Sequence, residues 1–328
     1  MAKVVIAGRI HPAGMALLEA EPGLEIDLIL DPGAALPMAR LADAEALLIR
    51  YGVLSATQAA AMPKLRVVSR HGVGCDNLPV QELAALGVPV TIVGAVNAVS
   101  VAEQVLAMLL ALTKQIGAYD AAVRSGNWAI RDSLAVVELS GRKLLLLGFG
   151  RIGREVARRA TAFDMDVLVH DPYVTDAEIH AAGCTPTADW RAVLPEIDAL
   201  SLHLPAGPET RGLIGSAELA RMKPTALIIN AARGGLVDEA ALHAALSGRM
   251  AAGGAGLDCF ADEPPSPDLP LLRLPNVVLS PHSAALSQEA AQRMGEVAAR
   301  NVIAGLKGCL DPALIFNRKA LKEAGHAA

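Results

Sequence analysis

Three residues with side chains suited to acid–base and anion-binding chemistry lie in the second half of this 328-residue chain. Arg233, Glu263 and His282 each come within a few residues of the end of an apolar, strand-like run. A guanidinium can bind a carboxylate and a keto oxygen, and an imidazolium can deliver a proton. A carboxylate beside the imidazole would orient it and raise its pKa. Together these three kinds of side chain suit hydride transfer to a 2-oxo acid, although each residue alone is more often part of a surface ion pair or of loop structure.

A glycine-rich segment upstream has the spacing of a dinucleotide-binding loop. It follows the apolar run 143–147, precedes a helical pattern over 154–163, and reads Gly148-Phe149-Gly150-Arg151-Ile152-Gly153. The spacing predicts a tight turn at Gly148, close approach of a pyrophosphate at Gly150, and close helix–strand packing at Gly153. The N-terminus of the following helix would bind the phosphates. The alternative is an incidental glycine-rich turn, which the flanking strand and helix disfavour.

An acidic residue stands where such a loop requires one. Asp171 comes 21 residues after Gly150, at the end of the strand-like run 166–170. Its carboxylate is placed to accept hydrogen bonds from both ribose hydroxyls. Its neighbours His170, Pro172 and Tyr173 include no Arg or Lys for a 2′-phosphate. The sequence therefore predicts NAD, rather than NADP, as the cofactor.

The elements that must position these residues alternate along the chain, as in an α/β fold with doubly wound parallel sheets. Short aliphatic runs typical of buried parallel strands alternate with helical segments rich in Ala, Leu, Glu and Arg. Predicted strands are 3–7, 46–49, 66–69, 143–147, 166–170, 199–204, 226–230, 254–258 and 277–280. A long helix over about 100–125 separates two such sets. A last helix over 288–306 could pack back on the first set.

Composition excludes several classes of protein. The 29 basic and 34 acidic residues are interspersed and give a net charge of −5, which argues against binding to nucleic acid or to a membrane surface. No run approaches the roughly 18 apolar residues of a membrane span. The N-terminus lacks a signal-peptide pattern, so we expect a cytoplasmic protein. Four scattered cysteines without a CxxC pair predict neither a disulfide framework nor a metal site.

Longer motifs carry a resemblance to a known family. The chain resembles the D-isomer-specific 2-hydroxyacid dehydrogenases, and among them the 3-phosphoglycerate dehydrogenase branch, over nearly its whole length. Besides residues 148–153, the resemblance rests on Asn230-Ala231-Ala232-Arg233-Gly234-Gly235-Leu236-Val237-Asp238-Glu239, on Gly256-Leu257-Asp258-Cys259-Phe260 with Glu263-Pro264, and on Ser280-Pro281-His282. It implies that Arg233, Glu263 and His282 are the catalytic set.

The resemblance also implies an architecture. A central Rossmann NAD-binding domain (99–286) would be inserted in a flavodoxin-like substrate domain (1–98 plus 287–328), with a cleft between them and a homodimeric assembly. Because the chain stops near residue 328, we expect no C-terminal regulatory domain of the kind found in longer phosphoglycerate dehydrogenases.

Binding residues are carried over from the same resemblance. The substrate residues would be Arg50, Arg70, His71, Val73, Gly74, Asn97 and Arg233, with Arg50 and Arg70 facing a substrate phosphate and Arg131 as a possible third. The cofactor residues would be Gly148, Phe149, Gly150, Arg151, Ile152, Gly153, Asp171, Leu204, Pro205, Thr210, Ala231, Ala232, Asp258 and His282. The backbone N–H groups of Val73 and Gly74 would bind the substrate carboxylate.

Two departures from the family pattern leave the substrate open. His71 stands where a small residue is common, and Ser283-Ala284 follows His282 where the phosphoglycerate branch usually has glycine. The alternatives are a glyoxylate/hydroxypyruvate reductase, another D-2-hydroxyacid dehydrogenase, or an NAD-sensing transcriptional corepressor of the same fold. A formate dehydrogenase is disfavoured, since that branch has Gln where Glu263 stands. The sequence does not fix the physiological direction of the reaction.

Overall fold

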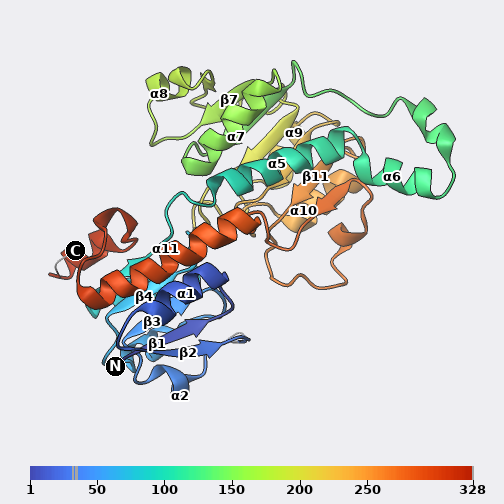
Figure 1. Cartoon of the computed structure of the whole chain (residues 1–328). Helices are drawn as coiled ribbons and strands as arrows, with labels where there is room; N and C mark the ends of the chain where they lie inside the picture. The colour runs from blue at the N-terminus through green and yellow to red at the C-terminus, as the bar shows by residue number, and fades with distance from the viewer. Residues whose placement is uncertain (32, 34–35, 327–328) are drawn as a thin grey trace. The chain divides into compact units, whose positions relative to one another are not determined.

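The computed structural model describes residues 1–31, 33 and 36–326, and the chain divides into two compact units. Unit 1 comprises Met1–Asn97 with Leu286–Ala328, and unit 2 comprises Ala98–Ala285. Each unit contains one parallel sheet flanked by helices, so the predicted fold class is confirmed (Figure 1).

The sheet of unit 1 has the strand order β2-β1-β3-β4-β5, with every pair parallel, which is the order of flavodoxin-like folds. The strands are β1 (Ala2–Ala7), β2 (Leu24–Ile29), β3 (Ala46–Ile49), β4 (Val67–Arg70) and β5 (Val90–Thr91). The helices are α1 (Pro12–Ala20), α2 (Met38–Leu41), α3 (Ala56–Ala60), α4 (Val80–Ala85), α11 (Gln288–Lys307) and α12 (Arg318–Glu323), with the 3₁₀ turn η3 (Pro312–Leu314). Every residue of β3 is buried, as the unbroken aliphatic run predicts.

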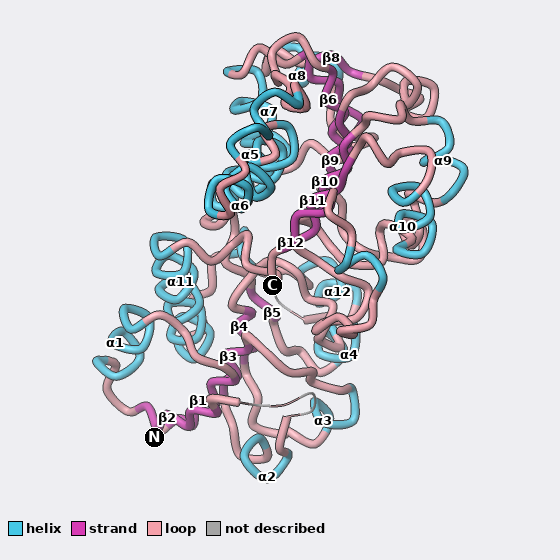
Figure 2. Tube along the Cα trace, turned by 90° about the vertical axis from the view of Figure 1, so that its right-hand side faces the viewer, coloured by secondary structure: helices cyan, strands magenta, loops and turns pink. Residues whose placement is uncertain are grey.

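The C-terminal helix α11 belongs to unit 1, as the resemblance implies. It lies with α1 on one face of the sheet, while α2, α3, α4 and α12 cover the other face (Figure 2). Glycines make this close packing possible, since a Cβ at Gly14 on α1 would lie 2.5 Å from the carbonyl oxygen of Gly295. A Cβ at Gly305 would lie 2.6 Å from the Val67 side chain on β4. The Asn301 side chain donates to the Ile92 carbonyl at 3.1 Å and fixes α11 to the edge of the sheet.

The sheet of unit 2 has the strand order β12-β11-β10-β9-β6-β7-β8, again all parallel. The strands are β6 (Lys143–Leu147), β7 (Asp166–His170), β8 (Thr185–Pro186), β9 (Ala199–Leu202), β10 (Leu227–Asn230), β11 (Gly254–Leu257) and β12 (Val277–Leu279). The chain order reverses between β6 and β9, and ligands of doubly wound sheets bind at such a switch point, outside the carboxyl ends of the strands. Those ends therefore define where the site must be.

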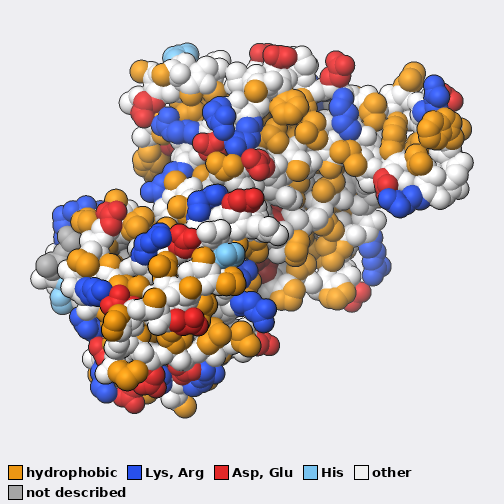
Figure 3. Space-filling model, in the orientation of Figure 1, with side chains coloured by type: hydrophobic (Ala, Val, Ile, Leu, Met, Phe, Trp, Pro, Cys, Tyr) orange, Lys and Arg blue, Asp and Glu red, His pale blue; other side chains and the backbone are white. Residues whose placement is uncertain are grey.

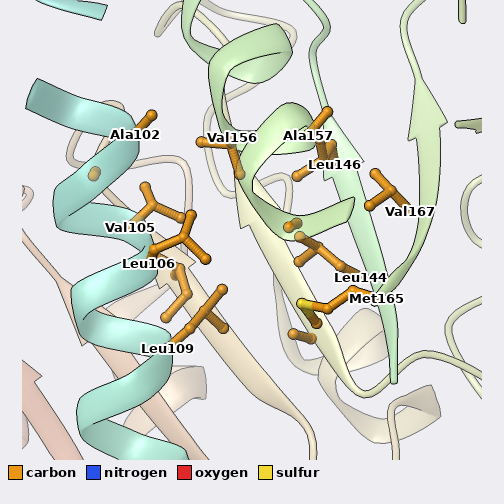
Figure 4. Close-up of a cluster of buried hydrophobic side chains, with 14 of the residues drawn as sticks. Ala102, Val105, Leu106, Leu109, Leu144, Leu146, Val156, Ala157, Met165 and Val167 are labelled. Atoms are coloured by element: carbon orange, nitrogen blue, oxygen red, sulfur yellow. The ribbon is translucent and has the colours of Figure 1, made fainter. Parts of the chain in front are cut away.

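Helices cover both faces of this second sheet, with α5 and α7 on one face and α9 and α10 on the other (Figure 2). The helices are α5 (Ala98–Thr113), α6 (Ile116–Arg124), α7 (Arg151–Ala162), α8 (Asp176–Ala181), α9 (Ser216–Arg221) and α10 (Glu239–Ser247), with 3₁₀ turns η1 (Trp128–Ser133) and η2 (Pro270–Arg273). Val105 and Leu109 of α5 pack with Val156 of α7 over Leu144 and Leu146 of β6 (Figure 4). This apolar layer holds the dinucleotide loop, which connects β6 to α7, between two rigid elements.

Two expectations about elements are wrong in detail. The helix expected over about 100–125 is broken, because Gln115 has a left-handed φ of 48° and separates α5 from α6. Strands β2, β5 and β8 were not predicted, since the edge strand β2 carries charged residues and the other two are only two residues long. Within the described residues, no single helix is long and apolar enough to cross a membrane, and α5 with α6, bent by 56°, meets the length and composition test only as a pair.

Candidate active site

In the dinucleotide loop, two glycines are required by contacts within the protein, whereas the third leaves space for a ligand. A Cβ at Gly148, where φ is +98°, would lie 2.5 Å from the His203 carbonyl oxygen, and one at Gly153 would lie 2.3 Å from the Gly148 carbonyl oxygen. The protein's own packing therefore excludes a side chain at both positions. A Cβ at Gly150 would meet nothing within 4 Å. Gly150 begins α7 and leaves open space at the helix N-terminus, as close approach of a pyrophosphate requires.

Asp171 lies directly after β7 and is tied to the dinucleotide loop. Its carboxylate accepts the Phe149 N–H at 2.7 Å through one oxygen and the Tyr173 N–H at 2.9 Å through the other. Each oxygen keeps a second lone pair, so the carboxylate can still accept ribose hydroxyls. The loop and Asp171 thus fit a dinucleotide without a 2′-phosphate. Of the remaining cofactor residues in this loop, Phe149 is fully buried, Ile152 is half-buried and Arg151 is exposed.

The loop after β9 lies on the other side of the switch point. Its residues Leu204 and Pro205 follow His203, whose carbonyl contacts the Gly148 turn. The Thr210 hydroxyl donates to the Pro205 carbonyl at 2.9 Å and closes the loop. These three predicted cofactor residues therefore lie beside the glycine loop, whereas Ala231 and Ala232 follow the next strand, β10.

His282 and Glu263 form a direct pair. The distance between His282 Nδ1 and Glu263 Oε2 is 2.7 Å, with about 47% of the imidazole and 36% of the carboxylate side chain exposed. The other Glu263 oxygen accepts the Phe260 N–H at 3.0 Å, so both oxygens are fixed. The backbone N–H of His282 donates to the backbone carbonyl of Asp258 at 2.8 Å, and φ at His282 is +49°. The imidazole is thus held in one orientation with one ring nitrogen committed to Glu263.

Charge and burial act in opposite directions on Glu263. Its partial burial raises the pKa of the carboxyl, whereas hydrogen bonds from His282 and the Phe260 N–H, together with the charges of His282 and Arg233, lower it. The net effect places the pKa of Glu263 below its ordinary value. Glu263 is therefore an ionised partner for the imidazole throughout the neutral range.

Asp258 has a role that its assignment as a cofactor residue did not anticipate. It is 1% exposed, and its carboxylate accepts the Ser280 hydroxyl at 2.5 Å and the backbone N–H groups of Ser283 and Ala284 at 2.9 and 3.0 Å. Asp258 therefore anchors the segment that carries His282. Its predicted contact with the nicotinamide stays a prediction.

Arg233 lies in the loop after β10, next to the loop that carries Glu263. The Asn230 side chain brackets this turn, donating to the Arg233 carbonyl at 2.8 Å and accepting the Ala232 N–H at 3.2 Å. An ideal Cβ at Gly234 would lie 1.7 Å from the Phe260 carbonyl oxygen, so only glycine allows the two loops to pack this closely. The charge of Arg233 accordingly contributes to the lowered pKa of Glu263. Unit 2 thus brings together all three predicted catalytic residues.

The predicted substrate residues of unit 1 follow β3 and β4, but Arg70 has a structural role. Its guanidinium donates to the backbone carbonyls of Gly74 at 2.9 Å, of Ile49 at 3.2 Å, and of Arg50 and His71 at 3.1 Å. These contacts join the ends of two strands to the glycine-containing loop. These contacts use Nε and Nη1 of the guanidinium, so the expectation that Arg70 faces a substrate phosphate stays a prediction.

The loop that Arg70 holds retains features of an anion site. In the part of the chain that the structure describes, the N–H groups of Val73 and Gly74 donate to no protein acceptor, as expected for groups that bind a carboxylate. Arg50 stacks on the Tyr51 ring at 4.6 Å and donates to the Arg9 carbonyl at 2.5 Å.

Two more predicted substrate residues of unit 1 are largely buried. Burial, together with the charges of Arg50 and Arg70, lowers the pKa of His71 to about 4, so its imidazole is neutral. His71 is 5% exposed, and Asn97 is also buried at 8% exposure.

The third arginine proposed for a phosphate lies elsewhere. Arg131 is in η1, is exposed, and is 3.7 Å from Asp132. It lies on the segment that follows α6 in unit 2, and its assignment to a substrate phosphate stays a prediction. Sequence reasoning missed two residues, Gly234 and Ser280, which position the loops of the site. The only signal for them was their place within the family motifs.

Comparisons with known proteins agree with this geometry. Residues 106–284 match the family described as D-isomer specific 2-hydroxyacid dehydrogenase, NAD binding domain. The D-3-phosphoglycerate dehydrogenase of Mycobacterium tuberculosis is 41% identical over 306 residues, which cover 93% of this chain but only 57% of that protein. This chain thus spans little more than half the length of that relative. The glyoxylate reductase of Korarchaeum cryptofilum is 36% identical, with 98% of this chain and 97% of that protein covered.

A solved structure extends the likeness to the whole fold. The D-lactate dehydrogenase of Aquifex aeolicus, complexed with NAD and lactic acid, superposes with a TM-score of 0.83 at 29% identity and covers 98% of each chain.

Proposed function

Because the chain belongs to the D-isomer specific 2-hydroxyacid dehydrogenase family, we propose that it is an NAD-dependent oxidoreductase that interconverts a D-2-hydroxy acid and a 2-oxo acid. The observation that carries the proposal is the 2.7 Å pair of His282 and Glu263, on the sheet edge where the Gly148–Gly153 loop opens. When bound, NAD supplies the hydride acceptor, and NADH the donor. All other chemistry comes from side chains of this protein.

His282 is the acid–base group of the proposed reaction. In the reduction direction it must be protonated, so that it donates to the keto oxygen as negative charge develops there. Glu263 accepts the other ring proton, holds the ring orientation and stabilises the imidazolium. In the oxidation direction the neutral imidazole takes the hydroxyl proton. Asp258 and Ser280 act indirectly by fixing the backbone around His282.

Arg233 supplies positive charge to the same edge. Its planar guanidinium is suited to bind the substrate carboxylate and the keto oxygen together. Such a contact strengthens as the oxygen becomes negative, so Arg233 contributes to catalysis as well as to binding. On unit 1, the assignment of the Val73 and Gly74 N–H groups to a carboxylate stays a prediction from the family resemblance.

Two substrate classes remain as candidates. Identity of 41% to a D-3-phosphoglycerate dehydrogenase supports a phosphorylated 2-hydroxy acid. The end-to-end likeness to a glyoxylate reductase supports a small unphosphorylated 2-oxo acid. The deciding experiment measures NAD reduction with 3-phosphoglycerate, glycerate and lactate, and NADH oxidation with hydroxypyruvate and glyoxylate. Tight NAD binding without turnover on any of these acids would favour the corepressor alternative and reject the enzyme.

The first prediction concerns cofactor choice. In Asp171→Ala, NAD binding should weaken by about tenfold, and the preference for NAD over NADP should shrink, because the carboxylate both accepts from the ribose and repels a 2′-phosphate. Isothermal titration with each cofactor measures both effects. Asp176→Ala, on the exposed first turn of α8, is the matched control. A wild-type protein that prefers NADP would contradict the role of Asp171.

The proposed assembly is a homodimer formed through the segment 116–138, here called the arm. Hydrophobic side chains are exposed on the arm (Figure 3): Ile116, Val123, Trp128, Leu134, Val136 and Val137 are 39–86% exposed. Several large apolar side chains exposed on one segment are typical of an interface between subunits. The arm's own hydrogen bond from the Val137 N–H to the Thr113 carbonyl, at 2.9 Å, fixes its base on α5.

The second prediction tests this assembly. Wild-type protein should have a solution mass of twice 33.9 kDa, and Trp128→Asp should shift it toward the monomer, since an ionised side chain replaces an apolar anchor. Light scattering behind size-exclusion chromatography measures the mass. Leu86→Asp, at an exposed apolar position in unit 1, should leave the mass unchanged. Equal masses for the two variants would reject the arm as the interface.

We also propose a cytoplasmic location. All four cysteines are free thiols, with Cys75, Cys184 and Cys259 buried and Cys309 exposed, which is typical of proteins in a reducing compartment. Cell fractionation tests this directly.

A further inference from the structure

A third side chain able to bind metal lies against the His282–Glu263 pair. The thiol sulfur of Cys259, a carboxylate oxygen of Glu263 and a ring nitrogen of His282 lie within 4.8 Å of one another. Cys259 and Glu263 share the loop after β11, and His282 follows the neighbouring strand β12. The chemistry proposed above uses the imidazole and the carboxylate but assigns nothing to the thiol.

We propose that Cys259, Glu263 and His282 form a site for a borderline-soft divalent cation, Zn²⁺ being the best fit, and that the bound ion inhibits the reaction. Thiolate, imidazole and carboxylate are the ligand types that Zn²⁺ takes, whereas Mg²⁺ and Ca²⁺ prefer oxygen ligands alone. Three protein ligands leave the fourth tetrahedral position for water, as in open zinc sites.

The spacing requires only side-chain adjustment. With zinc–ligand bonds of about 2.0–2.3 Å, the ligand atoms of a tetrahedral site are roughly 3.3–3.8 Å apart. Zinc would replace the hydrogen bond between His282 and Glu263, so their 2.7 Å separation must widen. The thiol sulfur, which lies within 4.8 Å of both atoms, must stay within ligand distance, and rotation about side-chain bonds provides these movements. The hydrogen bond from the Phe260 N–H to Glu263, and those from Ser283 and Ala284 to Asp258, hold the two loops that carry the ligands.

The surroundings favour a cation over an oxidised thiol. Cys259 is 3% exposed, and burial, with the negative charges of Asp258 and Glu263, raises the pKa of the thiol. A buried thiol in a negative field is a poor nucleophile and a poor target for oxidants. The same negative charges would attract a divalent cation. Of the charges that act on this thiol, only that of Arg233 has the opposite effect. Entry is from the side of the partly exposed imidazole and carboxylate.

Inhibition follows from the proton balance at His282. An imidazolium carries a proton on both ring nitrogens, so a nitrogen that binds metal cannot form it. Binding of Zn²⁺ releases the thiol proton, and any ring proton on the liganding nitrogen, to solvent. The general acid is then lost, whichever nitrogen binds the ion. This step rests on the proposed function, whereas metal binding itself does not.

Cobalt(II) is a spectroscopic probe for such a site. Protein treated with a chelator and then freed of it should bind one Co²⁺ per chain and develop a thiolate-to-cobalt charge-transfer absorption, which Zn²⁺ should abolish by displacement. Cys259→Ser should lose the absorption and bind Zn²⁺ at least tenfold more weakly. Cys184→Ser, at another buried thiol of unit 2, should keep both properties. Absence of the absorption in wild type, or its survival in Cys259→Ser, would overturn the proposal.

A second variant tests the metal site independently, in case Cys259→Ser does not fold. Glu263→Gln keeps the thiol and the imidazole, and it should weaken Zn²⁺ binding while the charge-transfer absorption persists at higher Co²⁺ concentration. Unchanged Zn²⁺ affinity in Glu263→Gln would also overturn the three-ligand site. Circular dichroism and NAD binding check that each variant is folded.

The activity measurement separates the two claims. Micromolar Zn²⁺ should inhibit wild type and Cys184→Ser reversibly, with recovery on adding a chelator, whereas Cys259→Ser should resist, each compared with its own metal-free rate. Bound Zn²⁺ without inhibition would refute the inhibitory claim and the acid–base role of His282, yet leave the metal site intact. Absence of turnover with all acids would refute the proposed function alone, since the cobalt spectrum does not depend on it.

Discussion

His282→Ala is expected to lower the rate of both reaction directions by a factor of about 10²–10⁴, the usual loss when a general acid–base residue is removed. The imidazole is the only group in the His282–Glu263 pair that can exchange a proton with substrate at neutral pH, because Glu263 is held ionised by its partners. The affinity for NAD should change little, since the dinucleotide loop lies on β6 and His282 follows β12. Steady-state kinetics and NAD titration measure the two effects.

The controls for this variant separate chemistry from folding. His180→Ala, on the exposed face of α8, should retain wild-type rates. Added imidazole should partly restore the rate of His282→Ala, since the pocket left by the side chain is open to solvent at 47% exposure. A His282→Ala variant that keeps more than a tenth of the wild-type rate would remove His282 from the acid–base role.

Arg233→Ala should lower kcat and raise KM, with a combined fall in kcat/KM of about 10²–10⁴. Two charge-assisted hydrogen bonds to the substrate, at about 1.5–3 kcal/mol each, account for this range. The bond to the carboxylate exists before and during the reaction and so appears in KM. The bond to the developing oxyanion strengthens in the transition state and appears in kcat.

Arg233→Lys distinguishes charge from shape. Lysine keeps the charge but lacks the planar fork, so its kcat/KM should lie between those of the wild type and Arg233→Ala. Arg211→Ala, in an exposed turn of unit 2, is the control for removing a cation. A change confined to KM in Arg233→Ala would contradict contact with the reacting oxygen and leave only carboxylate binding.

Most strands and the C-terminal helix were predictable from the sequence, because the buried strands of a parallel α/β fold are continuous aliphatic runs. The predicted helix 288–306 differs from the observed α11 by one residue at its end. The placement of Arg233, Glu263 and His282 at one edge of the sheet was also predictable, since each follows a strand and all the strands of unit 2 are parallel. The family motifs, including residues 148–153, identified the family correctly.

What could not be predicted depends on contacts between distant segments. The close packing of Gly234 on Phe260 brings Arg233 beside the Glu263 loop, and no local pattern reveals it. The sequence assigned Arg70 to a substrate anion, and it gave no sign that Nε and Nη1 also donate to four backbone carbonyls. The sequence assigned Asp258 to the cofactor, and it gave no sign that its oxygens also bind the His282 segment. In each case a polar group satisfies buried backbone or side-chain partners whose positions only the fold defines.

The central claim is that Glu263 stabilises a protonated His282, and the pH profile of kcat/KM for wild type and Glu263→Gln tests it most directly. Glutamine keeps the shape but removes the charge, so the imidazole should lose its proton at lower pH. Reduction, which needs the proton, should then decline at a lower pH than in the wild type, and oxidation, which needs the neutral ring, should begin at a lower pH. Profiles that superimpose in both directions would contradict the claim, even if the variant were slower.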